Sequence, residues 1–299
     1  MAKLFIVATP IGNLADFSAR AVDTLKAVDI IACEDTRHSK ILLDKYNIGT
    51  KLIAYHKFNE KNSTEGIIKL LKSGKNVALI SDAGMPLVCD PGQILVKRAI
   101  EEHIEYTVIP GANAMLCALV MSGFDTGCFA FFGFLSEKNK ECKAQLDKIS
   151  NFDGVSVIYS SKHNINADLN KLANVVAGRR VCVVSEISKV YERVEFFRLG
   201  EIVLDLDNMS TTKDAQNNGT AQSNEKADEP ITYIANPTGE YVVVIDKGEV
   251  GEKEMTDEEC VKMIDLLIKS GTNLTDACKQ IAKESKRSKR DLYNMYLKK

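Results

Sequence analysis

Four ionisable side chains, Glu34, Asp35, Arg37 and His56, follow two short apolar segments of this 299-residue chain. A carboxylate or an imidazole can remove a proton from a hydroxyl group, and a positioned base typically accelerates such a reaction by about 10²–10⁴-fold. We therefore predict these residues as catalytic, with the Glu34–Arg37 cluster preferred. Structural interpretations remain open beside this one. The two carboxylates also suit a helix N-terminus, with Arg37 as their surface partner, and a histidine is more often structural than catalytic.

The loop 81–92, with the sequence SDAGMPLVCDPG, is the most distinctive segment. It follows an apolar run, 76–80, that is typical of a strand buried on both faces. We expect Asp90 to cap the next helix and Pro91 to lie in its first turn. Asp82 also has a structural interpretation, since aspartate often caps a turn. A stiff loop at the carboxyl end of a strand is where open α/β sheets bind ligands.

Apolar segments and amphipathic segments alternate along the first half of the chain, and the pattern restarts after about residue 137. Such alternation predicts an α/β fold, with a mostly parallel sheet covered by helices on both faces. The expected strands of the first half are 3–8, 29–33, 51–55, 76–80 and 106–109, and the expected helices are 18–28, 38–46, 64–72, 93–102 and 114–121.

Three regions are predicted from the same pattern. The first is an α/β domain, 1–136, in which Phe129–Phe134 forms the last strand, and the second is an α/β domain at 137–250. Residues 207–230 have almost nothing to bury, so we predict a disordered surface insertion there. Short helices then form a small C-terminal segment at 256–299.

Composition excludes several classes of protein. The net charge of −2 gives no global positive field, so any surface for nucleic acid must be local. Eight scattered cysteines without a C-x-x-C pair favour buried thiols in a reducing cytosol, and we predict no metal site. No apolar run approaches the roughly 20 residues of a membrane span, so we expect a cytoplasmic protein without membrane contact.

Two motifs that the chain lacks limit which ligands could bind at the loops that follow the predicted strands. The chain has neither G-x-G-x-x-G after its first strand nor G-x-x-x-x-G-K-[ST], both of which bind phosphates through backbone amides. A bulky cosubstrate without phosphates, such as S-adenosylmethionine, would suit a cleft lined by Pro10, Asp82, Gly84 and Asn113. These residues permit that ligand, but their types and spacing alone do not identify it.

The C-terminal segment is basic. Residues 275–299 contain eight Lys and Arg residues against three acidic ones. A charged helical face is often only a solvated surface, but a basic helical segment can also bind RNA phosphates.

Three motifs, in order along the chain, carry a resemblance to a known family. They are ATPIGNL at 8–14, EDTRH at 34–38, and SDAGMP at 81–86 with DPG at 90–92. They resemble the signatures of the ribosomal RNA small subunit methyltransferase I family, within the tetrapyrrole-methylase-like, class III S-adenosylmethionine-dependent methyltransferases. The resemblance covers about residues 3–250, and the end of the chain resembles the family's helix-turn-helix-like segment.

The resemblance implies two α/β domains of tetrapyrrole-methylase type, with S-adenosylmethionine bound in the cleft between them, and a homodimer. It implies methylation of the ribose 2′-hydroxyl of a cytidine in small-subunit (16S) rRNA, near the decoding centre of the 30S particle. By motif position, the cosubstrate would contact Pro10, Asp82, Met85, Asn113, Ala114 and Tyr159, in addition to the Gly84 expected above. We expect RNA to be held by Arg37, Lys57 and Lys189, and by Lys286, Arg287 and Arg290 of the basic end.

The second domain departs from the family pattern. Ser160 and Asn164 replace the acidic residue and the arginine expected after the strand near Tyr159, and Ser185 replaces another arginine. Two alternatives therefore stay open. The chain could be a class III methylase of a small molecule such as a tetrapyrrole, which the basic end disfavours, or a catalytically weakened rRNA-binding or assembly factor.

Overall fold

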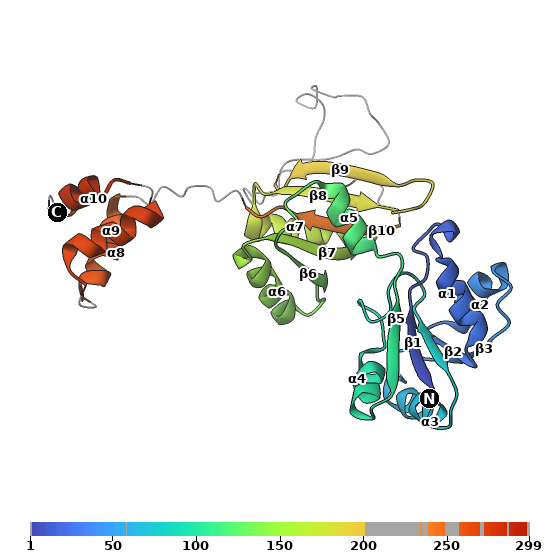
Figure 1. Cartoon of the computed structure of the whole chain (residues 1–299). Coiled ribbons are helices and arrows are strands. Elements are labelled where there is room, and N and C mark those ends of the chain that lie inside the picture. The colour runs from blue at the N-terminus through green and yellow to red at the C-terminus, as the bar shows by residue number, and fades with distance from the viewer. Residues whose placement is uncertain are drawn as a thin grey trace, which may run out of the picture. The chain divides into compact units, whose positions relative to one another are not determined.

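The computed structural model (Figure 1) describes residues 2–57, 59–200, 234, 239–248, 257–269, 272–285 and 287–297. The predicted insertion at 207–230 lies outside these ranges. Within them, no helix is both long enough and apolar enough to cross a membrane.

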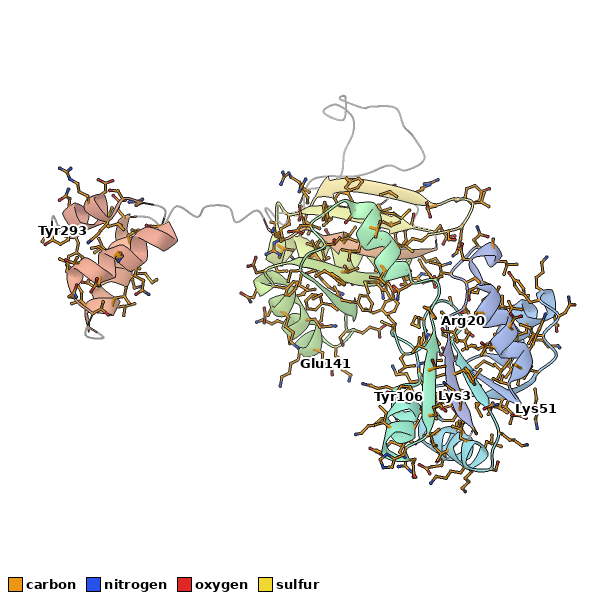
Figure 2. The ribbon with its side chains drawn as sticks, in the orientation of Figure 1. Lys3, Arg20, Lys51, Tyr106, Glu141 and Tyr293 are labelled. Carbon is orange, nitrogen blue, oxygen red and sulfur yellow. The ribbon has the colours of Figure 1, made fainter. Side chains whose placement is uncertain are left out.

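Five parallel strands form the first sheet, in the order β3-β2-β4-β1-β5. Their bounds are β1 Lys3–Val7, β2 Ile30–Cys33, β3 Lys51–Ala54, β4 Val77–Ile80 and β5 Glu105–Ile109. Every residue of the central strands β2 and β4 is buried, as the continuous apolar runs in the sequence predict. At the edge, Tyr106 of β5 is 43% exposed (Figure 2).

Four helices cover both faces of this sheet, which confirms the predicted arrangement. They are α1 Ala19–Ala27, α2 Thr36–Lys45, α3 Glu60–Lys72 and α4 Gln93–Glu101. Helices α1 and α2 pack on one face through Leu25 and Leu43. Helices α3 and α4 pack on the other through Ile67 and Leu95.

The second sheet is mixed, in the order β6-β7-β10-β8-β9. Its strands are β6 Phe129–Phe134, β7 Val155–Ser161, β8 Arg180–Ser185, β9 Arg193–Arg198 and β10 Glu240–Ile245. Only β6 and β7 are parallel, and the other pairs are antiparallel. Helices α6 Asn139–Asn151 and α7 Ile165–Val176 cover one face of the sheet.

The strand at Phe129–Phe134 is therefore real, but the expectation that it is the last strand of the first sheet was wrong. It pairs with β7 in the second sheet, because the chain leaves the first sheet after β5. The crossing is made by helix α5, Ala114–Ser122, whose Ala118 and Leu119 pack with Val184 and Val244 of the second sheet. Alternation of apolar residues predicts a strand, but it does not say which strand will pair with it. As a division into domains, the ranges 1–136 and 137–250 stay a prediction.

Residues 247–299 form a separate compact unit. It contains α8 Asp257–Lys269, α9 Leu274–Ser285 and α10 Lys289–Leu297. Cys260, Ile264 and Ile281 are fully buried in its small core. The chain thus has the predicted α/β fold with a C-terminal helical segment.

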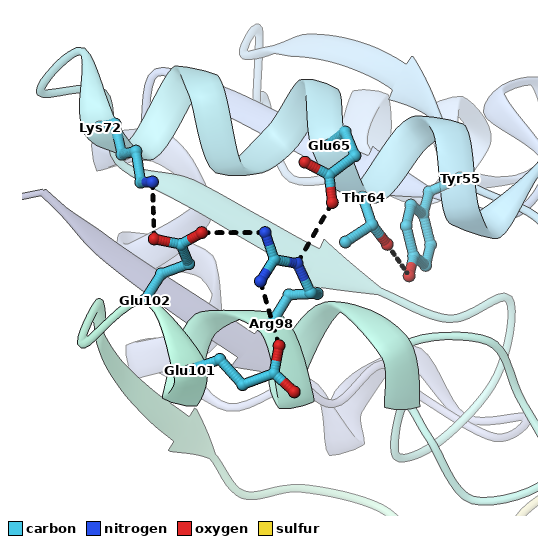
Figure 3. Close-up of polar contacts among 7 residues, drawn as sticks. All are labelled: Tyr55, Thr64, Glu65, Lys72, Arg98, Glu101 and Glu102. Carbon is cyan, nitrogen blue, oxygen red and sulfur yellow. Dashed lines mark hydrogen bonds and ion pairs between the residues drawn. The ribbon is translucent and has the colours of Figure 1, made fainter.

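A charged network joins α3 to α4 in the first sheet's helical layer (Figure 3). The Arg98 guanidinium lies 3.2 Å from Glu65, 3.0 Å from Glu101 and 2.9 Å from Glu102. The Lys72 ammonium lies 2.6 Å from Glu102. Because single exposed ion pairs contribute little to stability, the network mainly sets how the two helices are aligned.

The backbone N–H groups at the start of α4 donate hydrogen bonds to a residue of another helix, α3. The Glu60 carboxylate accepts hydrogen bonds from the backbone N–H groups of Gly92 and Ile94, at 2.9 and 3.3 Å. It also accepts one from the hydroxyl of buried Tyr55, at 3.2 Å. The prediction that Asp90 caps this helix was wrong. The N-cap residue is Gly92, and no residue that directly precedes α4 caps it with its side chain.

We expect Glu60→Ala to lower the free energy of unfolding by about 1–3 kcal/mol, since it leaves these donors without their acceptor. Urea unfolding measures this. Glu60→Gln is the matched control, because it keeps an acceptor oxygen and should lose less. Equal unfolding midpoints for Glu60→Ala and wild type would contradict this role.

Candidate active site

One cavity of about 310 Å³ is lined by residues of both sheets. The first-sheet loops contribute Ile11, Asp82, Ala83, Gly84, Met85, Val88, Cys89, Asp90, Asn113 and Ala114. The second sheet and its loops contribute Phe134, Tyr159, Ser160, Ser161, Glu186, Ile187, Lys189, Glu240, Tyr241 and Val242. Its first-sheet lining comes from the carboxyl edge, where open α/β sheets bind ligands.

Two backbone hydrogen bonds join the loops that follow β1 and β4. The Thr9 N–H donates to the Gly84 carbonyl at 2.9 Å, and the Gly84 N–H donates back to Thr9 at 3.1 Å. The Thr9 hydroxyl also donates to the Ser81 carbonyl at 3.2 Å. Gly84 has φ of +79°, a left-handed conformation that favours glycine. This pairing brings Asp82 and Met85 to the cavity wall.

The start of α5 is fixed by two side chains. Asn113 caps the helix, because its side-chain oxygen accepts a hydrogen bond from Leu116 N–H at 3.0 Å. The Tyr159 hydroxyl of β7 accepts one from Met115 N–H at 3.2 Å. Burial raises the pKa of Tyr159 to about 12, so its phenol is neutral at physiological pH. Tyr159 therefore ties the second sheet to the loop that ends at Asn113.

The loop 186–192 closes the other side of the cavity. The Lys189 ammonium lies 3.0 Å from the Glu186 carboxylate, and the Lys189 chain lies directly over Gly12. A Cβ atom at Gly12 would lie 2.5 Å from Lys189 Cγ and 3.0 Å from the Ile187 carbonyl oxygen. The Ser188 hydroxyl donates to the Asp16 carboxylate at 2.5 Å. Gly12 thus lets the two loops approach closely.

Backbone strain gathers in the two loops around the cavity. Among the described residues, six other than glycine have positive φ. Asn47 and His103 directly follow helix ends, where this conformation is common. The other four are Leu87 and Cys89 in the central loop and Glu186 and Ser188 in the second. Such strain persists where the surrounding structure enforces it, and it concentrates at functional sites.

Carboxylates surround the first-sheet side of the cavity. Burial, with the charges of Glu34, Asp82 and Glu240, raises the pKa of Asp90 to about 6, although a hydrogen bond from Ser81 opposes the shift. Burial and the charge of Asp82 also raise the pKa of Glu34. The Asp82 carboxylate accepts a hydrogen bond from Asp35 N–H at 3.3 Å. These groups favour a cationic ligand or a proton.

The structure separates the predicted site residues into two groups. Those that line the cavity are Asp82, Gly84, Met85, Asn113, Ala114, Tyr159 and Lys189. Pro10 is buried in the loop next to Ile11 and does not itself line it. Glu34, Asp35, Arg37 and His56 also lie outside the lining, although Glu34 is close enough to Asp82 and Asp90 to influence their charges.

Asp35 and Arg37 form the structural pair that the sequence left open as an alternative. Asp35 caps α2 by accepting a hydrogen bond from Arg37 N–H at 2.8 Å. Its carboxylate lies 3.1 Å from the Arg37 guanidinium, which is 91% exposed. This hydrogen bonding lowers the pKa of Asp35 to about 2, so it is a poor proton acceptor at neutral pH.

The basic residues expected to hold RNA lie in different settings. Lys57 and Arg290 are exposed. Arg287 is half-buried in an ion pair with Asp257, and Lys189 is paired with Glu186 at the cavity. Lys286 lies outside the described residues.

Several lining residues were missed from the sequence: Asp90, Ser160, Ser161, Glu186 and Glu240. Glu240 pairs with Ser161 across β10 and β7, and Glu186 accepts a hydrogen bond from Glu240 N–H at 3.3 Å. These contacts join segments more than 50 residues apart, so only strand order could reveal them. Asp90 lies in the loop that the sequence singled out, but we interpreted it as a helix cap and not as a site residue. Among the described residues, no group of three His, Cys, Asp or Glu side chains could hold a metal ion.

Comparison with known proteins identifies the family. The model for tetrapyrrole (corrin/porphyrin) methylases matches residues 3–203. The chain belongs to this family. It is therefore an S-adenosylmethionine-dependent methyltransferase, and the resemblance drawn from the motifs is confirmed.

Curated relatives cover nearly the whole chain. Ribosomal RNA small subunit methyltransferase I of Bacillus subtilis is 36% identical over 298 residues, 99% of this chain and 94% of that protein. The protein of the same name from Synechocystis is 36% identical over 99% of this chain and 98% of its own length. That from Mycoplasmopsis pulmonis is 46% identical over 68% of this chain and 91% of its own length.

Solved structures share the fold at low identity. A diphthine synthase matches with a TM-score of 0.56 and 13% identity, over 83% of this chain and 90% of that one. The methyltransferase CobJ matches with a TM-score of 0.56 and 16% identity, over 83% of this chain and 95% of that one.

The contact over Gly12 can be tested. We expect Gly12→Ala to lower the free energy of unfolding by about 1–3 kcal/mol, because the added methyl group overpacks Lys189 and the Ile187 carbonyl. In a Lys189→Ala background the loss should shrink, since one of the two clashing groups is gone. Gly66→Ala is the control, because a Cβ atom there meets nothing within 4 Å. Chemical denaturation that finds Gly12→Ala as stable as Gly66→Ala would contradict the close approach.

Proposed function

We propose that this enzyme methylates the ribose 2′-hydroxyl of a cytidine in small-subunit rRNA, near the decoding centre, using S-adenosylmethionine. The observation that carries the proposal is one acidic cavity in a chain that is 36% identical, over 99% of its length, to a small-subunit rRNA methyltransferase.

In this proposal the cosubstrate binds in the cavity. The motif residues Asp82, Gly84, Met85, Asn113, Ala114 and Tyr159 line it, and Pro10 stiffens the neighbouring loop. When bound, S-adenosylmethionine supplies a methyl group activated by a positively charged sulfonium. The carboxylates of Asp82, Asp90 and Glu240 suit that charge, and the Lys189–Glu186 pair leaves no excess of positive charge on the opposite wall.

The main task of the protein is alignment. Methyl transfer is an in-line displacement, and holding two reactants in line can contribute about 7–11 kcal/mol to the barrier reduction. The joined loops at Thr9 and Gly84 and the Tyr159 anchor provide a stiff frame for that purpose. Of the four residues predicted as catalytic, Glu34 keeps the strongest support, because it lies close enough to the lining residues Asp82 and Asp90 to interact with their charges. Asp35, Arg37 and His56 act around it, with Arg37 available for phosphates.

RNA is proposed to meet the protein through local basic residues. Lys57 and Arg290 are exposed, so their side chains suit contacts with phosphates. Lys189 would act at the cavity, and Lys286 and Arg287 belong to the basic end. Because the net charge is −2, these local charges must supply the attraction.

We further propose a cytoplasmic homodimer. Helix α5 leaves Leu116 and Val120 46% and 74% exposed, and β9 leaves Phe196 56% exposed. Phe196 contacts Phe124, just after α5, with ring centroids 6.3 Å apart, so the residues lie on one side of the second sheet. A second copy would bury this apolar surface.

The function is tested with purified protein, methyl-labelled S-adenosylmethionine and small ribosomal subunits from cells that lack the protein. We expect one labelled ribose 2′-O-methyl group per subunit, mapped by resistance of the adjoining bond to alkali. Label on a base, label on a tetrapyrrole alone, or no transfer despite bound cosubstrate would each overturn the proposal.

Asp82 provides a test of the cosubstrate site. We expect Asp82→Ala to weaken S-adenosylmethionine binding by roughly 10–150-fold, the range for loss of a charged hydrogen bond. Asp44→Ala is the matched control, because Asp44 is exposed on α2 and pairs with Lys40, at 3.3 Å. Calorimetry that gives both variants the affinity of wild type would refute this placement.

A further inference from the structure

Asp90 has the features of a reacting group rather than of a structural one. It lines the cavity, and it lies in the strained part of the central loop. Cys89 before it has φ of +68°, and Gly92 after it has φ of +135°. A Cβ atom at Gly92 would lie 2.7 Å from both Leu79 and Leu87 side chains, so the turn that presents Asp90 is tightly packed.

The helix that follows does not need Asp90. Glu60 satisfies the N–H groups of Gly92 and Ile94 at the start of α4, and the side chain of Asp90 accepts from neither. A carboxylate at this position could have capped its own helix, as aspartates commonly do. Here the capping is done from α3, and the Asp90 carboxylate remains available to the cavity.

Three carboxylates from different strand ends lie near Asp90. Glu34 follows β2, Asp82 follows β4, and Glu240 begins β10, and all three repel a negative charge on Asp90. A hydrogen bond from Ser81 opposes the rise in the pKa of Asp90. The charge of Asp90 in turn contributes to the raised pKa values of Cys89 and Tyr159. Glu186 and Lys189 line the same cavity as a mutually neutralising pair.

We propose that Asp90 is the base that accepts the proton of the target ribose 2′-hydroxyl, a role that rests on the methyl transfer proposed above. The O–H bond breaks and its proton passes to the Asp90 carboxylate. The oxygen electron pair forms the new bond to the methyl carbon, and the carbon–sulfur bond breaks with its electron pair remaining on sulfur. The proton on Asp90 then returns to water.

The neighbouring carboxylates fit this step less well. Asp82 lines the cavity, but its carboxylate already accepts a hydrogen bond from Asp35 N–H at 3.3 Å. Glu34 lies outside the cavity lining, and Asp35 has a lowered pKa. Asp90 combines access with basicity: its raised pKa, about 6, leaves it ionised at pH 7 yet a stronger base than an ordinary carboxylate.

The test compares Asp90→Asn with wild type in single turnover, at saturating S-adenosylmethionine and small ribosomal subunits. We expect the methylation rate at pH 7.5 to fall by about 10²–10⁴-fold, while calorimetry finds cosubstrate affinity within about threefold of wild type. Asp90→Glu should recover part of the rate, because it restores a carboxylate. Asp44→Asn, on the exposed surface of α2, should leave the rate unchanged.

The pH profile separates a base from a positioning residue. The wild-type rate should decline as the pH falls through the pKa of Asp90, at about 6 or lower once the positive sulfonium is bound, because only the carboxylate accepts a proton. The residual activity of Asp90→Asn should lack this decline. A decline that persists in Asp90→Asn, or one removed instead by Glu34→Gln, would overturn the proposal.

The controls keep the outcome interpretable. Asp90→Asn removes repulsion among carboxylates, so its thermal unfolding temperature should not fall below that of wild type. Equal rates for wild type and Asp90→Asn would refute Asp90 as the base while leaving the enzyme assignment intact. A parallel loss of cosubstrate affinity would instead make Asp90 a binding residue. Failure of the wild-type protein itself to methylate rRNA would count against the proposed function.

Discussion

The two hydrogen bonds between Thr9 and Gly84 are the contacts on which the site depends. They join the loops after β1 and β4, which are adjacent strands of the parallel sheet, and so fix the distance between the first motif and the central loop. Parallel strands place such loops at one edge, but loops without mutual contacts would be free to move apart. Because Gly84 adopts a left-handed conformation there, the pairing also turns the chain so that Asp82 and Met85 face the cavity.

The cavity brings together several carboxylates whose negative charges repel one another. Carboxylates that repel one another are held together at its first-sheet side, and part of that cost is expressed as the raised pKa values of Asp90 and Glu34. A ligand with a positively charged centre relieves this repulsion, whereas the uncharged sulfur left after methyl transfer does not. Such an arrangement therefore holds a positively charged ligand more tightly than a neutral one.

Strain and support are divided between different parts of the fold. The loops contain the unusual φ angles of Leu87, Cys89, Glu186 and Ser188, whereas every residue of the central strands β2 and β4 is buried. Glu60 shows how the two are connected: by capping α4 from α3, it holds the end of the central loop without using any side chain of that loop. This arrangement leaves the Asp90 carboxylate out of the capping of α4.

The sequence by itself determined the parallel first sheet and most of the motif residues around the cavity. Those features depend on local patterns, namely apolar runs and short loops after strands. Tertiary structure alone decided that Phe129–Phe134 joins the second sheet and that Asp90 faces the cavity. The physical reason is that strand pairing and shared burial are contacts between distant segments. Local periodicity shows that a residue can make such a contact, but not which partner it will meet.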